Sequence, residues 1–372
     1  MSILFQPESI GTLELPNRLI RSATAEYMSD LEGKPEQPLA DLYAELARGG
    51  IGLIITGHAF VHEGGRCHLH MTGTHRDDLI PTLEMLTRAV HEEGGLVVMQ
   101  LNHGGRQCPA DAIPGSPVAP SPVTLSKGKE RPQELNEDGI REIITAFGEA
   151  AGRAKAAGFD GVQIHGAHGY LVNQFNSPAA NQRRDRWGGT PARRMRFLEE
   201  VALSIRHQVG DDYPVLIKLG MEDYVRDGLT LKDSVEIVRH LADWGLNALE
   251  VSSGIGRTSV RKDVLRPEDE AYFLDLARAA REATHLPIIL VGGIRSKDVM
   301  ERILEEGSAD FISMSRPLIR EPDLPRRLRQ GQERSSCISC NLCWPPPGEY
   351  GIACRDPNRE NSQAGDDAEG NQ

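Results

Sequence analysis

The chain has 372 residues, with 42 lysines and arginines against 54 aspartates and glutamates, which gives a formal net charge of −12. This length suits one large α/β domain, and an acidic chain lacks the positive surface that nucleic acid and anionic membranes require. The longest apolar runs have the length of strands and are far too short to cross a bilayer. The first residues show no basic start and no long apolar stretch, so we expect no secretory signal and a cytoplasmic location.

A repeating unit runs along the chain: a short apolar run, a polar or glycine-rich loop, then a longer amphipathic stretch. Continuous apolar runs are typical of parallel strands covered on both faces. Gly158, Gly245 and Gly307 stand where three of the intervening helices should end. Eight units predict an α/β fold, the (β/α)8 TIM barrel; the alternative, an open doubly wound sheet, is weakened because no G-x-G-x-x-G turn follows a strand. The predicted strands are 18–23, 52–56, 96–101, 161–165, 215–219, 248–252, 288–291 and 311–314.

Two regions interrupt the pattern. Residues 104–135 hold several prolines and predict a long excursion over the mouth of the barrel. The tail from Pro357 is polar, acidic and free of aromatic residues, which predicts disorder. The expected organisation is therefore a barrel over 1–330, a cysteine-rich segment over 331–356 packed on it, and a disordered tail over 357–372.

Ligands of such barrels bind at the C-terminal ends of the strands, and two predicted strand ends there suit an anion. Gly292 and Gly293 close the seventh strand just before a helix, and Ser315 and Arg316 close the eighth. Backbone N–H groups and the dipole at a helix start attract anions, and an arginine can hold two anion oxygens at once. We predict a phosphate site here; the alternative is that the two glycines only form a tight turn.

His165, His168 and Tyr170 follow the fourth predicted strand. Two imidazoles this close can both donate N–H bonds to one carbonyl or phenolate oxygen, which prepares an enone for hydride addition. Tyr170 can donate a proton near the same place. The alternatives are a metal pair or structural histidines, although a metal needs a third ligand and no other strand end offers an obvious one.

Lys218 lies within the apolar run VLIKL of the fifth predicted strand. Lysine is seldom buried without a partner. A positive charge beside N1 and C2=O of a flavin would stabilise the reduced ring. The alternative is an ion pair with a carboxylate such as Glu222.

The six cysteines fall into two groups, since Cys67 and Cys108 are isolated and four others crowd together. In a large chain without a signal peptide, such crowding indicates a metal site before it indicates disulfides. The spacing C-x2-C-x2-C-x10-C suits an iron–sulfur cluster better than zinc, which more often takes two separated C-x-x-C pairs. A zinc knuckle and a set of free thiols stay open as alternatives. The four predicted ligands are Cys337, Cys340, Cys343 and Cys354.

Over about residues 3–330, the chain resembles the old yellow enzyme family of flavin oxidoreductases. The resemblance depends on several spaced motifs. They are PNR at 16–18, QLNHGGR at 100–106, HGAHGYL at 165–171, QFNSP at 174–178, NQRRDRWGG at 181–189, and SRPL at 315–318 followed by PDL at 322–324.

The resemblance implies a bound FMN, reduced by NADH or NADPH and reoxidised by an activated alkene. Gln100 would hydrogen-bond the pyrimidine edge of the flavin. Lys218 stands where the family usually has an arginine beside N1, so the single charge of an ammonium group replaces the two-pronged guanidinium. The phosphate would be held at the two strand ends described above. The flavin-binding residues are then Ser22, Ala23, Thr24, Ala25, Gln100, Lys218, Gly292, Gly293, Ser315 and Arg316.

The same resemblance assigns the substrate side of the site. His165 and His168 would hold the substrate carbonyl, with Tyr170 as the proton donor. Ala25 departs from the family, which often has threonine or cysteine touching flavin O4 at this position. Alanine cannot hydrogen-bond there, which leaves the redox potential and the preferred substrate open.

The four crowded cysteines resemble the cluster segment of a longer branch of the family, the dienoyl-CoA reductases and trimethylamine dehydrogenases. There they hold a [4Fe-4S] cluster that passes electrons between FMN and a second flavin domain. Since that domain is not part of this chain, the electron partner is expected to be a separate protein.

Three functions follow as hypotheses. The first is an NAD(P)H-dependent ene reductase acting on small enones, enals or related carbonyl compounds, which histidine in place of tyrosine at position 165 favours. The second is a dehydrogenase or demethylase that oxidises its substrate and passes electrons through the cluster. The third is a non-catalytic electron-transfer subunit. We also expect a homo-oligomer.

Overall fold

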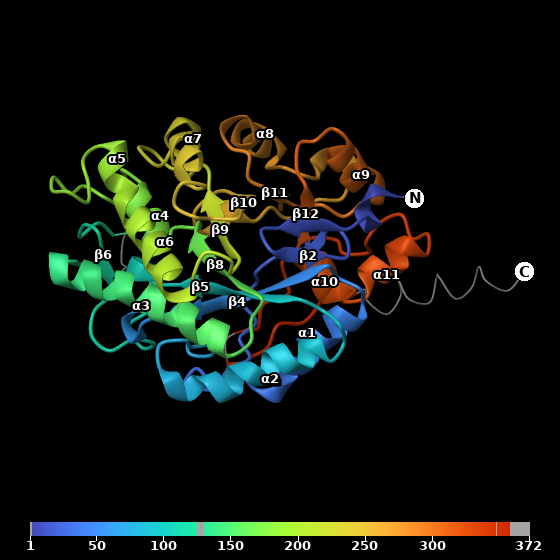
Figure 1. The fold of residues 1–372 in the computed structure, drawn as a ribbon, viewed down its shortest axis with the longest axis horizontal. Helices are drawn as coiled ribbons and strands as arrows, with labels where there is room; N and C mark the ends of the chain where they lie inside the picture. Colours follow the sequence, from blue (N-terminus) through green and yellow to red (C-terminus); the bar gives the residue numbers. More distant parts are fainter. Residues whose placement is uncertain (1, 125–129, 347, 358–372) are drawn as a thin grey trace, which may run out of the picture.

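The computed structural model describes residues 2–124, 130–346 and 348–357, and most of the predicted disordered tail lies outside them. Eight parallel strands form a closed barrel in the order β10-β11-β12-β3-β4-β5-β8-β9, so the predicted TIM barrel is confirmed. Figure 1 shows the helices around the strands. The barrel strands are β3 (Leu19–Arg21), β4 (Leu53–Phe60), β5 (Val97–Asn102), β8 (Gly161–Gly166), β9 (Val215–Gly220), β10 (Ala248–Ser252), β11 (Ile288–Leu290) and β12 (Phe311–Met314).

The helices alternate with these strands. Gly158 and Gly307, with φ of +82° and +69°, directly follow the C-caps of the helices that end at Ala156 and Glu305, in the left-handed conformation that glycine adopts without a steric cost. Gly245, with φ of +81°, does not end its helix as predicted, because that helix stops at His240 and a turn follows it. No helix within the described residues combines the length and the apolarity that crossing a bilayer requires. The helices are α1 (Gln37–Arg48), α2 (Ile80–His91), α3 (Glu137–Ala156), α4 (Leu171–Asn176), α5 (Pro191–Arg194), α6 (Arg196–Val209), α7 (Leu231–His240), α8 (Leu274–Ala283), α9 (Lys297–Glu305), α10 (Arg316–Arg320) and α11 (Leu324–Arg329).

The apolar core has two parts, which leave only one end of the barrel open. The larger cluster lies between the strands and the surrounding helices. In the smaller cluster, Leu13 and Leu15 pack on in-pointing residues near the strand starts, such as Leu53 and Phe311. They belong to an antiparallel hairpin of β1 (Glu8–Ile10) and β2 (Leu13–Leu15), which therefore covers the N-terminal end of the barrel. The C-terminal end stays available for a ligand.

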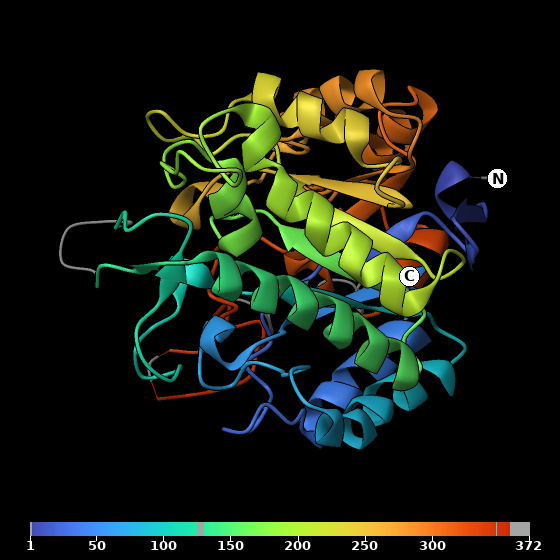
Figure 2. The same cartoon turned by 60° about the vertical axis from the view of Figure 1, so that its left-hand side comes forward.

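The predicted excursion joins β5 to α3 and carries two short parallel strands, β6 (Val118–Ala119) and β7 (Gln133–Glu134). In Figure 2 it extends in teal at the left of the molecule. Gln107, near its start, donates through Nε2 to the carbonyl oxygen of His168 at 2.8 Å. The excursion therefore reaches the residues after β8.

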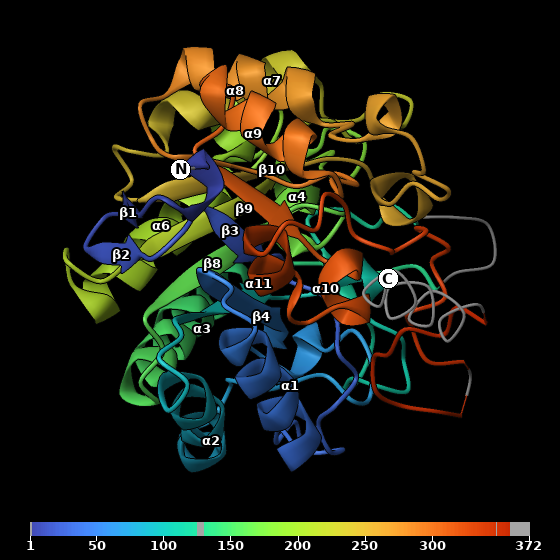
Figure 3. The ribbon, with the colours of Figure 1, turned by 90° about the vertical axis from the view of Figure 1, so that its right-hand side faces the viewer.

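The cysteine-rich segment follows α11 and returns toward the barrel. Figure 3 shows it in red beside α10. The backbone N–H groups of Ser335, Gly351 and Ile352 donate to the carbonyls of Arg295 (2.9 Å), Tyr27 (2.8 Å) and Glu26 (2.8 Å). The segment is thus joined by backbone hydrogen bonds to the loops after β3 and β11.

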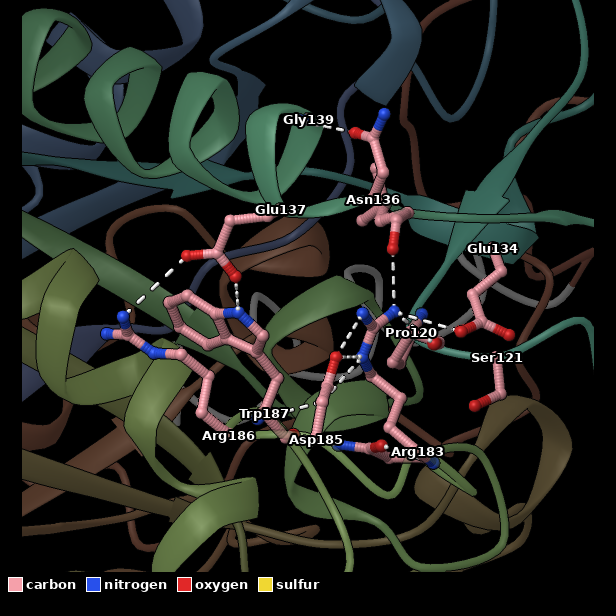
Figure 4. Close-up of polar contacts among 12 residues, drawn as sticks. Pro120, Ser121, Glu134, Asn136, Glu137, Gly139, Arg183, Asp185, Arg186 and Trp187 are labelled. Carbon is pink, nitrogen blue, oxygen red and sulfur yellow. Dashed lines mark hydrogen bonds and ion pairs between the residues drawn. The ribbon is translucent and has the colours of Figure 1, made fainter.

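The motif at 181–189 has a structural role in fastening the excursion. Arg183 donates through Nη1 to the carbonyl oxygens of Leu135 (2.6 Å) and Pro120 (3.0 Å), and pairs with Asp185 at 2.6 Å. Trp187 donates through Nε1 to the Glu137 carboxylate. Figure 4 shows these contacts joining the motif to the start of α3 and to the excursion. The longest motif of the resemblance therefore holds the backbone of the excursion in place, and none of its residues lines the cavity at the C-terminal end of the barrel.

Candidate active site

A cavity of about 320 Å³ opens at the C-terminal end of the barrel, a size that suits a small molecule. Every barrel strand or the loop after it contributes to its wall, and Ser339 and Trp344 of the cysteine-rich segment add to it. Gly292 and the four crowded cysteines do not line it. The predicted residues that do are Ser22, Ala23, Thr24, Ala25, Gln100, His165, His168, Tyr170, Lys218, Gly293, Ser315 and Arg316.

His165 and His168 lie side by side in this wall, with ring centroids 5.1 Å apart and ring planes at 89°. The Nδ1 atom of His165 is buried and has no hydrogen-bond partner among the described residues. Nε2 of His168 lies 2.8 Å from Oγ of Ser252. A buried imidazole nitrogen without a partner costs free energy unless a ligand satisfies it, so His165 is suited to meet a polar ligand atom.

Burial keeps these side chains uncharged. It lowers the pKa of His168 to about 3, with a further contribution from Lys218, and lowers the pKa of His165 well below its ordinary value. Burial also raises the pKa of Tyr170 well above its usual range. Near neutral pH each imidazole therefore carries one N–H donor, and Tyr170 keeps its proton.

His58 belongs to the same cluster, although the sequence did not indicate it. Its ring centroid lies 5.2 Å from that of Tyr170 and 5.9 Å from that of His165, and its Nδ1 is 2.8 Å from Nδ2 of Asn102. The strand predicted over 52–56 continues as β4 to Phe60, past a register shift between Ile55 and His58. If the strand had been predicted to end at Phe60, His58 would have stood near its C-terminal end, where residues are expected to line the ligand site. Further wall residues were not among the predicted site residues, and Tyr27, Cys67 and His68 are among them.

Lys218 lies in a buried polar network of residues on the barrel strands or directly after them, which we call the barrel network: Ser22, Gln163, Lys218, Glu250 and Ser313. Nζ of Lys218 lies 3.2 Å from Oε1 of Glu250 and donates to Oγ of Ser22 at 2.8 Å. Glu250, which is completely buried, also accepts hydrogen bonds from Ser22, Ser313 and Gln163 at 2.7 to 2.9 Å. Burial lowers the pKa of Lys218, and Glu250 opposes that shift. The alternative for Lys218, an ion pair with a carboxylate such as Glu222, is present, but the carboxylate is that of Glu250. Glu222 follows the end of β9, the strand that carries Lys218, whereas Glu250 lies opposite Lys218 on the neighbouring strand.

Three of the residues predicted to hold a phosphate, Gly293, Ser315 and Arg316, lie in the cavity wall. Gly293 has φ of +71°, and a Cβ there would stand 2.7 Å from the ring of Tyr272, so only glycine fits. Ser315 exchanges a 2.7 Å hydrogen bond with Thr24, and Arg316 donates through Nη1 to the carbonyls of Arg261 (2.8 Å) and Ser339 (3.3 Å).

The helix start that was expected to face this anion has another partner. The backbone N–H groups of Arg295 and Ser296, just before α9, donate to Oε2 of Glu270 at 2.7 and 2.9 Å. A carboxylate of the chain satisfies these two donors, so the predicted phosphate site would depend on the other groups at this end of the barrel. Gly292, with φ of +143°, turns the backbone ahead of this helix.

The four crowded cysteines lie outside the cavity wall, close enough to influence one another's ionisation. The pKa of Cys343 is raised to about 12, first by burial and then by the thiols of Cys337, Cys354 and Cys340. Arg320 donates through Nη1 to Sγ of Cys354 at 3.6 Å. Within the described ranges, no group of three or more histidine, cysteine or acidic side chains is arranged to hold a metal ion. The iron–sulfur cluster therefore stays a prediction from the spacing of the four cysteines.

Comparison with known proteins identifies a family. A family model described as the NADH:flavin oxidoreductase / NADH oxidase family matches residues 3–335. An NADH oxidase from Thermoanaerobacter brockii is 38% identical over 348 residues, which are 91% of this chain and 53% of that protein. An NADPH dehydrogenase from Geobacillus thermodenitrificans (strain NG80-2) is 35% identical over 325 residues, which are 87% of this chain and 93% of that protein.

Two solved structures share the architecture. An old yellow enzyme homologue from Zymomonas mobilis has a TM-score of 0.78 at 27% identity, covering 90% of this chain and 95% of its own. A complex of 2-naphthoyl-CoA reductase with 2-naphthoyl-CoA has a TM-score of 0.85 at 28% identity, covering 92% of this chain and 54% of its own. The chain thus spans about half the length of this reductase and of the NADH oxidase.

Proposed function

Because this chain belongs to the NADH:flavin oxidoreductase / NADH oxidase family, we propose that it is an FMN-dependent oxidoreductase that moves hydride from NAD(P)H to an activated alkene. FMN and NAD(P)H are the cofactor and co-substrate that fit this family. Bound FMN would supply the hydride carrier, which accepts a hydride from NAD(P)H and donates it to the alkene. The substrates we propose are small enones, enals or related carbonyl conjugates, with the protein in the cytoplasm.

The donor set of the cavity suits FMN. Gln100 offers a side-chain amide for the pyrimidine edge, and Lys218 offers a positive charge beside N1, where it would favour the anionic reduced ring. Gly293 leaves room for close approach of a phosphate, which Ser315 and Arg316 would bind. Ser22, Ala23, Thr24 and Ala25, together with Gly292, complete the proposed cofactor site.

The chain's own residues would do the rest of the chemistry. His165 and His168, both uncharged, would donate N–H bonds to the carbonyl oxygen of the substrate and so withdraw electrons from its alkene. Tyr170, which keeps its proton, would donate that proton to the carbon next to the carbonyl. The observation that carries the proposal is the buried, unsatisfied Nδ1 of His165 beside His168 and Tyr170.

The test separates substrate binding from flavin binding. We expect the purified protein to be yellow and to bind a phenol with a long-wavelength charge-transfer band. His165→Ala combined with His168→Ala should abolish this band and leave the flavin bound. The matched control is His240→Ala, a partly exposed histidine of α7 outside the cavity. Loss of flavin from the double variant, or a colourless protein that refuses added FMN, would overturn the assignment.

The spacing of the four crowded cysteines supports a second candidate. In it, Cys337, Cys340, Cys343 and Cys354 hold a [4Fe-4S] cluster, and the protein oxidises its substrate and passes electrons to a separate partner protein. Iron and sulfide assays on anaerobically purified protein test the cluster. Reduction of the cluster by substrate, and not by NAD(P)H, would favour this candidate over the first. Homo-oligomeric assembly belongs to both proposals and is tested by light scattering.

A further inference from the structure

Two cysteines that are remote in sequence meet beside the cavity. Cys67 follows the turn after β4, and Cys108 follows the turn after β5; the N–H of Gly104 donates to the carbonyl of Gly65 at 2.9 Å and joins these loops. A Cβ on Gly104 would stand 2.5 Å from Sγ of Cys108 and 2.6 Å from Sγ of Cys67. The two sulfur atoms therefore flank one point of space, and they can do so because residue 104 is glycine.

The two thiols differ in their access to solvent. Cys67 lines the cavity and is partly exposed, whereas Cys108 is 4% exposed and does not line it. Nδ2 of Asn102 donates to Sγ of Cys67 at 3.5 Å. A molecule that enters the cavity can thus reach one sulfur, while the other lies behind it.

We propose that Cys67 and Cys108 form a redox-active dithiol that reacts with small disulfides entering the cavity. The thiolate of Cys67 attacks one sulfur of the disulfide, forms a mixed disulfide and releases the first small thiol. The thiolate of Cys108 then attacks Sγ of Cys67, closes the protein disulfide and releases the second small thiol. The two protein thiols lose two electrons and two protons, which the small disulfide gains. This reaction does not require the flavin.

Oxidation would change the wall of the cavity. Closing the disulfide, with its S–S bond of about 2.05 Å, draws Cys67 toward Cys108 and away from Asn102. Asn102 also contacts His58 at 2.8 Å, and His58 packs beside Tyr170. The disulfide should therefore alter ligand binding on the histidine side of the cavity.

The reaction should be slow at neutral pH and faster in alkali. Burial and the neighbouring Cys108 raise the pKa of the Cys67 thiol well above its ordinary value. Only the thiolate attacks, so the rate of modification should rise about tenfold per pH unit between roughly pH 7 and 9.

The experiment uses bis(2-hydroxyethyl) disulfide on the full chain, followed by acid quenching, alkylation of the remaining thiols and peptide mapping. In the wild type we expect a cross-link between the peptides that carry Cys67 and Cys108. Cys108→Ser should accumulate a mixed disulfide on Cys67. In Cys67→Ser, Cys108 should be modified at least tenfold less than Cys67 is in Cys108→Ser. Gly104→Ala, which pushes the sulfurs apart, should suppress the cross-link and leave the mixed disulfide on Cys67.

Each of the following outcomes would overturn the proposal: no modification of Cys67 up to pH 9, equal modification of Cys108 in Cys67→Ser, or a mixed disulfide on Cys67 that persists in the wild type without a cross-link. If Gly104→Ala does not fold, the results from Cys67→Ser and Cys108→Ser are sufficient to test the proposal. The four crowded cysteines in the same digest report general thiol reactivity, so a cross-link confined to them also counts against the proposal.

Discussion

The barrel network and the cysteine-rich segment border the same cavity but are held in place in different ways. In the barrel network, parallel pairing sets Glu250 opposite Lys218, and their side chains meet because strand register aligns them. The cysteine-rich segment has no described helix or strand, and a buried ion pair between Arg320 and Asp356 at 2.6 Å helps to fix its end. A defect in the network should therefore weaken the whole barrel, whereas a defect in the segment should loosen it locally.

The largest expected effect comes from Glu250→Gln. This change removes the negative partner of a lysine that is almost fully buried, and breaking a buried pair costs about 3–5 kcal/mol. The free energy of unfolding, measured by denaturant titration, should fall by about this amount. Glu222→Gln is the control, because Glu222 is only partly buried and makes no ion pair with Lys218; it should change stability by less than about 0.5 kcal/mol. Equal losses in both variants would show that the pair has no special role.

Acid should weaken the histidine side of the barrel next. The pKa of His58 is lowered from 6.5 to about 4, chiefly by burial. Above pH 6.5 both the folded and the unfolded chain keep this imidazole neutral; below it only the unfolded chain takes up the proton. Stability should therefore fall between pH 6.5 and about 4, by up to about 1.4 kcal/mol per pH unit from this group.

Two measurements check this acid dependence. NMR titration should show the His58 imidazole neutral down to about pH 4. His58→Gln should remove the contribution of this one group, up to about 1.4 kcal/mol per pH unit, while the other buried histidines such as His168 keep theirs. A His58 that titrates near its ordinary value in the folded protein would contradict the burial that the structure assigns to it.

The smallest effect on global stability is expected from Asp356→Asn. Arg320 keeps the side chains of Ser336 and Cys354 as partners, so the loss should be smaller than for Glu250, and about 1.4 kcal/mol would raise local opening about tenfold. Limited proteolysis after residue 330 should speed up by that factor, while the melting temperature of the barrel stays within about one degree. The control is Asp323→Asn, whose ion pair with Arg326 is exposed. A matching fall in melting temperature would mean that the segment and the barrel unfold as one unit.

Pattern and spacing predicted the barrel because its strands are apolar runs that need both faces covered, and eight such runs leave few arrangements. Residues that directly follow a strand, such as His165 and Ser315, could be assigned to the cavity for the same reason. His58 was not predicted as a cavity residue, because β4 contains a register shift and continues beyond its apolar run. A local irregularity of this kind leaves no mark on hydrophobic periodicity.

The amino-acid sequence by itself determined which residues form strands and which side chains stand at the strand ends, since both depend on neighbours along the chain. Only the tertiary structure decided that Lys218 pairs with Glu250, that Glu270 satisfies the start of α9, and that Cys67 meets Cys108. Each of these contacts joins segments that barrel closure and strand register bring together. A local pattern carries no information about such distances, so the partners of buried polar groups became visible only in the folded chain.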